Sequence, residues 1–167
     1  FGKLKIGRRL IGLASARKLP EWHPKPWSDN EFPPVPSANH PPEAVLFVDT
    51  FTRWFEPEIP RAARALLEAG PWNVQSLQNH SGRPLCCGRT YLSGGMLNAA
   101  KRELGRVLEA VAPAARTGAW IVGLEPSCIY TLRDEAPALL PGEDAAIVAQ
   151  QAILLEEFLD QEWDKGN

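Results

Sequence analysis

The stretch Ala44-Val-Leu-Phe-Val48 decides the fold, because it is a short apolar run without a polar break. A run of this kind predicts a strand that is buried on both faces, which is typical of a parallel sheet. A second strand with weaker, alternating polarity is predicted at 72–77, and a third at 119–124. The three strands are far apart in the chain, so the segments between them must cross back over the sheet.

Apolar residues at helical spacing fill the intervals between the predicted strands. Helices are expected between Pro57 and Gly70, from Ser93 as the cap to near Pro113, around 128–136 and over 145–162. The alternation of strands and helices predicts an α/β fold with three layers, in which a mostly parallel sheet is flanked by helices in a Rossmann-like arrangement.

Composition and charge exclude several classes of protein. The 167 residues are 44% hydrophobic and 23% charged, which is ordinary for a globular domain. With 18 Lys and Arg against 20 Asp and Glu, the net charge of −2 gives no electrostatic case for binding nucleic acid. No apolar run reaches the roughly 18 residues of a membrane-spanning helix.

The first 42 residues differ from the rest of the chain. Eight of the 16 prolines lie between Pro20 and Pro42, which predicts an extended proline-rich N-terminal segment. Trp22, Trp27 and Phe32 indicate that this segment lies against a surface. A short amphipathic helix is expected near 4–14, where basic residues gather, and a membrane-surface or nucleic-acid role for them is the less favoured interpretation.

The predicted organisation has three parts. Residues 1–42 are expected to be a linker or tail from an upstream segment, 43–162 an α/β domain and 163–167 a tail. The chain starts at Phe1 and shows no basic stretch followed by an apolar run, so we expect a piece of a longer protein without a signal peptide.

Three cysteines carry the candidate chemistry: Cys86, Cys87 and Cys128. An odd number with an adjacent pair is a poor disulfide framework, which favours a reducing compartment. The thiols are then packing groups, ligands of a metal or cluster, or a redox nucleophile. Nucleophilic chemistry at Cys128 is the least favoured alternative, because His80 is its only candidate base.

Two acids are expected at the same edge of the sheet as the cysteines. Asp49 follows the first strand, Cys86 and Cys87 follow the second, and Glu125 and Cys128 follow the third. The carboxyl ends of parallel strands form one edge, so five potential ligands are predicted to meet there. For each acid, capping of a helix start is the alternative.

The residues around the thiols suit a soft metal centre. Thiolates are the preferred ligands of iron–sulfur clusters and zinc. Cys128 is expected near a helix start, which favours its thiolate. Four glycines surround the adjacent pair and allow close backbone approach and N–H donation to sulfur, namely Gly82, Gly88, Gly94 and Gly95.

At Leu85-Cys-Cys-Gly88 the chain resembles the cysteine-rich domain with a Cys-Cys-Gly motif. That domain occurs in heterodisulfide reductases, in the iron–sulfur component of glycolate oxidase and in anaerobic glycerol-3-phosphate dehydrogenases. The resemblance implies that Cys86, Cys87 and Cys128 are cluster ligands and that Gly88 belongs to the cofactor loop. Asp49 and Glu125 stand where the family has two further cysteines.

The substituted pattern, with Phe47-Val-Asp49-Thr-Phe-Thr and Leu124-Glu-Pro-Ser-Cys128, resembles the first cysteine-rich copy of large FAD-linked oxidases. This likeness spans about residues 44–160. It implies an iron–sulfur electron-transfer domain of an FAD-dependent dehydrogenase for glycolate, D-lactate or D-2-hydroxyglutarate, inactive as an isolated piece. The implied partners are an FAD domain, a ferredoxin-type segment and a second cysteine-rich copy of the same polypeptide.

Several alternatives stay open at this point. The site with Asp49 and Glu125 would hold an unusual or partial iron–sulfur cluster, such as 4Fe-4S, a structural zinc ion, or no metal in an interaction domain. The resemblance implies a cytoplasmic protein, with peripheral association with the inner membrane as an open alternative. Arginines in the edge loops are candidates for a substrate carboxylate, although surface ion pairing is the favoured interpretation for Arg53, Arg83 and Arg89. Packing is the favoured role for Tyr91 and Tyr130.

Overall fold

The protein is described by a computed structural model that covers residues 20–31, 42–77 and 82–166. Four parallel strands form one sheet in the order β2-β1-β3-β4. Their bounds are β1 (Ala44–Phe47), β2 (Val74–Ser76), β3 (Trp120–Gly123) and β4 (Ala152–Leu154). The predicted α/β fold with a parallel sheet flanked by helices is confirmed.

Helices occupy most of the remaining described chain. They are η1 (Asp29–Glu31), α2 (Thr50–Trp54), α3 (Glu58–Ala69), α4 (Arg89–Ser93), α5 (Leu97–Arg116), α6 (Pro126–Tyr130), the π-helical turn η2 (Thr131–Glu135), α7 (Ala136–Leu139), α8 (Glu143–Gln151) and α9 (Leu155–Asp164). The segments α6, η2 and α7 follow one another without a break, so the predicted short helix after Pro126 is longer than expected.

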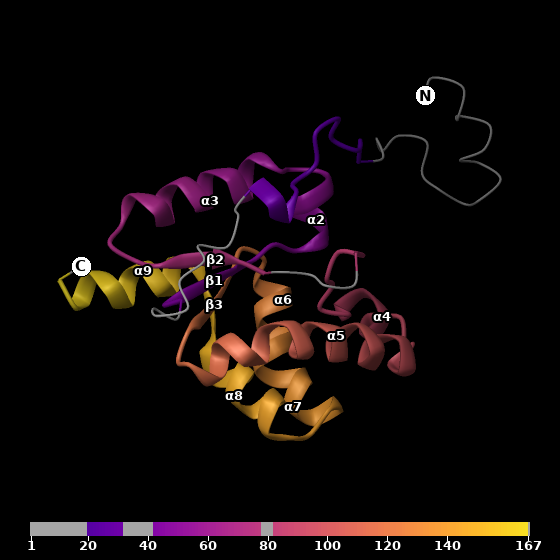
Figure 1. Ribbon diagram of the computed structural model, residues 1–167. Helices are drawn as coiled ribbons and strands as arrows, with labels where there is room; N and C mark the ends of the chain where they lie inside the picture. The colour runs from indigo at the N-terminus through magenta and orange to yellow at the C-terminus, as the bar shows by residue number, and fades with distance from the viewer. Residues whose placement is uncertain (1–19, 32–41, 78–81, 167) are drawn as a thin grey trace.

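Successive residues of each strand point to opposite faces, and two cores result. Val45 and Phe47 of β1 pack into one core with α5, α6 and α8, whereas Leu46 packs into the other with α3 and α9. Figure 1 shows α3 on one side of the sheet and α5, α7 and α8 on the other, and Phe158 of α9 packs into the same core as Leu67 of α3. Burial on both faces explains why β1 reads as a continuous apolar run.

The expected single helix over 145–162 is wrong, since the structure divides it into α8, β4 and α9. Ala152, Ile153 and Leu154 are buried and pair in parallel with 121–123 of β3. An apolar run of this length satisfies both helical spacing and a buried strand, and pairing with β3 satisfies its backbone groups within the sheet.

The loop expected over 79–95 contains a short helix, α4, within its described part. Ser93 is the last residue of α4 and does not cap the long helix; that helix starts at Leu97, after Met96. Two glycines, Gly94 and Gly95, separate α4 from α5, and the positive φ of Gly95 allows the tight turn between them.

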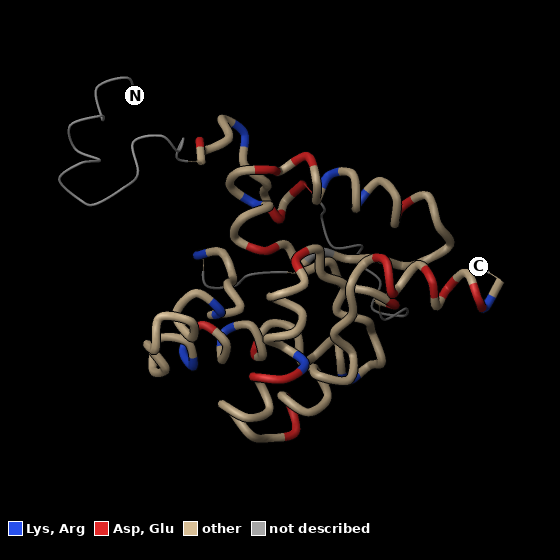
Figure 2. The backbone as a smooth tube through the Cα atoms, turned by 180° about the vertical axis from the view of Figure 1, so that it is seen from behind, with Lys and Arg blue, Asp and Glu red and all other residues tan. Residues whose placement is uncertain are grey.

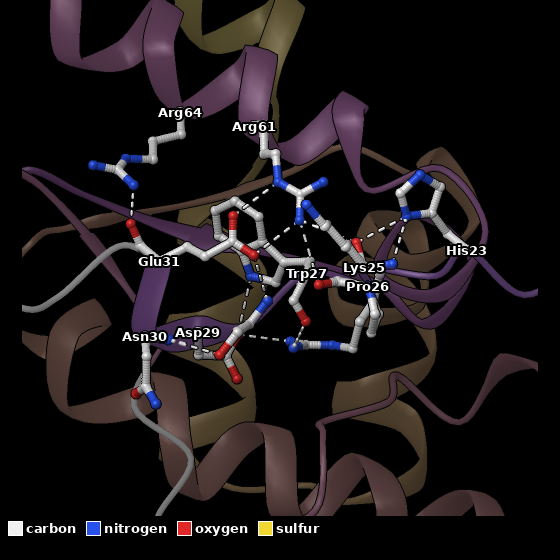
Figure 3. Close-up of polar contacts among 11 residues, drawn as sticks. His23, Lys25, Pro26, Trp27, Asp29, Asn30, Glu31, Arg61 and Arg64 are labelled. Atoms are coloured by element: carbon white, nitrogen blue, oxygen red, sulfur yellow. Dashed lines mark hydrogen bonds and ion pairs between the residues drawn. The ribbon is translucent and has the colours of Figure 1, made fainter.

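Residues 20–31, here called the strap, lie against α2 and α3. Trp27 is only 3% exposed and belongs to the core that contains Leu46. Its backbone N–H donates to the carbonyl oxygen of Arg53 at 2.9 Å. Figure 3 shows the polar contacts of the strap, including the ion pair between Arg61 and Glu31 at 2.8 Å.

The expectation that the proline-rich segment contacts a surface holds for Trp27. Trp22 is 66% exposed, although its ring lies 5.8 Å from that of Trp54 and 4.9 Å from that of Phe55. Phe32 and the amphipathic stretch expected at 4–14 lie outside the described residues.

In the part of the chain that the structure describes, no helix has the length and apolar character needed to cross a membrane.

Replacement of Trp27 by alanine should lower the free energy of unfolding by about 3 kcal/mol or more, because it empties a buried site. The matched variant Trp22→Ala should cost about 1 kcal/mol or less, since that indole is mostly exposed. Urea unfolding followed by circular dichroism measures both. If Trp27→Ala lowered the free energy of unfolding by no more than Trp22→Ala, the strap would not be part of the folded unit.

Candidate thiol site

The structure brings the cysteines together at the carboxyl edge of the sheet. The Sγ atoms of Cys87 and Cys128 are 2.9 Å apart, and both residues are buried. Cys86 is partly exposed, and the side chain of Thr50 lies near enough to its sulfur to counter the rise in the pKa of this thiol. Thr50 directly follows Asp49, so the loops after β1, β2 and β3 all meet at this point.

Close backbone packing sets the positions of the thiols. Gly88 has φ +82°, and a Cβ atom there would lie 2.9 Å from the carbonyl oxygen of Ala100 in α5. At the end of β3, a Cβ on Gly123 would lie 2.3 Å from the side chain of Ile129. Gly88 therefore seats the Cys86–Cys87 loop on α5, and Gly123 lets α6, which carries Cys128, approach the strand.

Backbone N–H groups act on the pKa values of two of the thiols. The N–H of Gly88 counters the rise in the pKa of Cys86, and the N–H of Arg89 counters the rise in the pKa of Cys87. Such donors stabilise a thiolate and are one means by which proteins tune sulfur ligands. The sequence signal for them is the glycine that follows the cysteine pair.

In the metal-free protein other effects outweigh these donors. The Cys87 thiol and burial raise the pKa of Cys86 well above its usual range. The Cys128 thiol, followed by burial, raises the pKa of Cys87 to about 12. Both groups are therefore protonated thiols at neutral pH, and a bound cation would have to displace their protons.

Asp49 is a helix cap in the structure. Its Oδ1 accepts hydrogen bonds from the N–H groups of Phe51 at 2.7 Å and Thr52 at 3.1 Å. Its Oδ2 accepts from the hydroxyl of Thr52 at 2.6 Å. With 1% exposure and three donors satisfied, this carboxylate holds the start of α2, which is the capping alternative.

Glu125 caps α6 with one oxygen. Its Oε1 accepts from the N–H of Ser127 at 3.0 Å and from the Ser127 hydroxyl at 2.6 Å. Among the described residues, Oε2 of Glu125 has no hydrogen-bond partner. Glu125 is partly exposed, so it keeps one oxygen that a ligand can reach.

An ion-pair network fastens the cysteine loop to α5. Glu103 is 7% exposed and accepts from Arg83 at 2.7 Å and from Arg106 at 2.9 Å. Arg106 also donates to the carbonyl oxygen of Arg83 at 2.6 Å. The polypeptide just before Cys86 is thereby held in place, a role for Glu103 that the sequence pattern did not indicate.

The remaining candidate residues have structural roles. Ion pairs join Arg83 to Glu103 and Arg89 to Glu135, in agreement with the favoured interpretation of these two arginines. Arg53 is also ion-paired, with Asp29, but it is only 5% exposed, so the expectation of a surface pair is wrong for this residue. The expectation that Tyr91 and Tyr130 are packed is wrong, since they are 36% and 46% exposed. His80 lies outside the described residues.

The segment that contains the cysteine loop is rich in basic residues. The segment 82–106 has five basic residues and one acid, whereas α9 has five acids and no base. Figure 2 shows this contrast between the region of α4 and α5 and the acidic helix that leads to the C-terminus. Three of the five bases are ion-paired, Arg83 and Arg106 with Glu103 and Arg89 with Glu135, so carboxylates balance much of this charge.

Of the five ligands predicted, Asp49 and Glu125 are engaged as caps of α2 and α6, whereas the three thiols have no capping role. Two sulfurs on a tetrahedral zinc ion with bonds of about 2.3 Å lie about 3.8 Å apart. Cys87 and Cys128 are closer, at 2.9 Å, so metal binding requires them to separate. Across 20–31, 42–77 and 82–166, no group of three or more His, Cys, Asp or Glu side chains has the geometry of a metal site.

No family model, curated protein or solved structure matches this chain.

Two variants of Asp49 separate capping from metal ligation. Asp49→Ala should lower the free energy of unfolding by about 1–2 kcal/mol, because it leaves the start of α2 uncapped. Asp49→Asn keeps an oxygen acceptor and should cost less than about 0.5 kcal/mol. Urea titrations in the presence of a chelator measure both values. Equal destabilisation by the two changes would show that the charge of Asp49 matters more than its cap.

The Glu103 network should make stability depend on pH. Burial raises the pKa of Glu103, but hydrogen bonds from Arg83 and Arg106 outweigh it and hold the pKa below the ordinary value of 4.5. The carboxylate therefore contributes its full stabilisation above pH 4.5, and this is lost as the pH falls through the lower folded-state pKa. Glu103→Gln should be less stable than the native chain at pH 7.

Thermal unfolding between pH 7 and pH 3 tests this expectation. The difference in melting temperature between the native chain and Glu103→Gln should shrink on acidification. A constant difference over that range would contradict the assigned role of the Glu103 charge.

Proposed function

We propose that this chain is an iron–sulfur electron-transfer domain of an FAD-dependent 2-hydroxyacid dehydrogenase, with Cys86, Cys87 and Cys128 as cluster ligands. The observation that carries the proposal is the meeting of these thiols at the carboxyl edge of a parallel sheet, with Cys87 and Cys128 in contact. This edge is where α/β proteins build their sites.

The surroundings of the sulfur atoms support a thiolate-ligated centre. The N–H groups of Gly88 and Arg89 counter the rise in the pKa values of Cys86 and Cys87, and the segment 82–106 has five basic residues against one acid. Both features compensate the negative charge that thiolates bring when a cation replaces their protons. A bound cluster supplies one-electron transfer, which the side chains of this site lack.

Glu125 completes the proposed ligand set. Its oxygen Oε2 has no partner among the described residues, and the helix that it caps carries Cys128. Three soft sulfurs and one hard oxygen would give a centre whose stability and potential differ from those of an all-thiolate centre. Asp49 would act on the site through α2 and Thr50, because its oxygens are engaged in the cap.

The resemblance of the Cys-Cys-Gly stretch supports the wider part of the proposal. On that basis the chain works beside an FAD domain, a ferredoxin-type segment and a second cysteine-rich copy, and its substrate class is glycolate, D-lactate or D-2-hydroxyglutarate. A cytoplasmic protein, with peripheral contact to the inner membrane as an alternative, follows from the same resemblance. The residues of this chain would hold the cluster and shield it from solvent.

Structural zinc is the second candidate. The same three thiols and the open oxygen of Glu125 make four donors, which is the number that tetrahedral zinc takes. In that case the ion would tie the loop after β2 to the start of α6 and would have no redox role.

Metal analysis of protein purified without oxygen distinguishes these candidates. We expect iron and sulfide in similar molar amounts, reduced at least about tenfold in Cys87→Ser. The control Asp49→Asn keeps all three thiols and should retain the native content. Zinc without sulfide would favour the structural site. Protein without iron, sulfide or zinc would contradict both candidates.

A further inference from the structure

The contact between Cys87 and Cys128 has a consequence in the absence of metal. Their sulfur atoms are 2.9 Å apart, about 0.9 Å farther than in a disulfide bond of about 2.05 Å. Cys87 lies in the loop after β2 and Cys128 lies in α6, 41 positions away, and both are buried. The fold has therefore already brought the pair close to bonding distance.

We propose that Cys87 and Cys128 form a reversible disulfide when the site holds no metal, so that oxidation and metal binding compete for the same sulfur atoms. The inference goes beyond the electron-transfer function, since it concerns the metal-free chain alone. Metal ligation requires the two sulfurs to separate, whereas the disulfide requires them to approach, and one geometry excludes the other.

Cys86 is the unfavourable partner for either thiol. A disulfide between neighbouring residues departs from ordinary disulfide geometry, so Cys86 and Cys87 do not pair readily. The Thr50 side chain and the N–H of Gly88 also lie beside the sulfur of Cys86. Cys86 is partly exposed, so it should stay free and reactive with alkylating reagents.

The burial of Cys87 and Cys128 limits the size of the oxidant that can reach their sulfur atoms. Cys87 and Cys128 are 4% and 7% exposed, which favours a small peroxide over a bulky disulfide such as oxidised glutathione. One thiol gives up its proton as its sulfur attacks hydrogen peroxide. The O–O bond breaks, a sulfenic acid forms, and the released proton joins the leaving hydroxide to give one water. The second thiol then attacks the sulfenic sulfur, forms the S–S bond and releases a second water. Two thiols lose two hydrogens, and one peroxide becomes two waters.

The bond would join the cysteine loop to α6. Gly88 and the Arg83–Glu103–Arg106 network hold that loop on α5, and Gly123 holds α6 on β3. The disulfide therefore needs little movement of either element. Thiol reductants should reverse it and restore the metal-binding thiols.

The test treats the chelator-stripped chain with hydrogen peroxide and follows intact mass after alkylation of free thiols in denaturant. The native chain should lose about 2 Da and retain one alkylated cysteine. Cys86→Ser should close the disulfide at the native rate and retain none. Cys87→Ser and Cys128→Ser should close an intramolecular disulfide at least about tenfold more slowly. Circular dichroism checks that each variant is folded.

Three results would overturn the proposal: loss of the disulfide in Cys86→Ser, native-rate closure in Cys87→Ser, or oxidation of the native chain only to sulfinic acids or linked dimers. A further arm loads the chain with zinc before the peroxide, and protection from the 2 Da loss supports the competition. The main experiment uses metal-free protein, so a chain that never binds iron can still form this disulfide. Failure of the iron–sulfur proposal and failure of the disulfide proposal are therefore distinguishable.

Discussion

Parallel pairing of β1 with both β2 and β3 is the constraint on which the rest of the structure depends. Strands that run in one direction present their carboxyl ends at one edge, so the loops that follow them meet although they are far apart in sequence. The thiols of Cys87 and Cys128 come into contact for this reason. Glycines at the end of β3 and after the cysteine pair then permit the close approach that a side chain would prevent.

The strap extends this connection to the chain that precedes the sheet. Trp27 is buried, and Arg53 of α2 donates to Asp29 at 2.7 Å. Asp49 caps the other end of the same short helix, and the next residue, Thr50, contacts Cys86. A displacement of the strap would therefore move α2, whose first residue, Thr50, lies beside Cys86.

The sequence was sufficient for the strands whose apolar runs are unambiguous, for α3 and for the meeting of the three thiols. It was insufficient where one pattern satisfies two structures. The apolar run at Ala152 fits a helix or a buried strand, and pairing with β3 decides between them. The acids were equally ambiguous, because a carboxylate after a strand can cap a helix or bind a cation, and only the contacts reveal that Asp49 caps α2. The pair between Arg83 and Glu103 joins residues 20 positions apart and has no local signal, whereas the pair between Glu103 and Arg106 is local.

The central claim is that the thiols meeting at this edge form one centre for a soft metal. X-ray absorption at the iron edge, measured on protein purified without oxygen, tests it most directly. The account predicts a first shell dominated by sulfur and iron–iron scattering beyond it, with the sulfur shell lost when Cys87 is replaced by serine. A first shell of nitrogen and oxygen only, unchanged by that replacement, would contradict it.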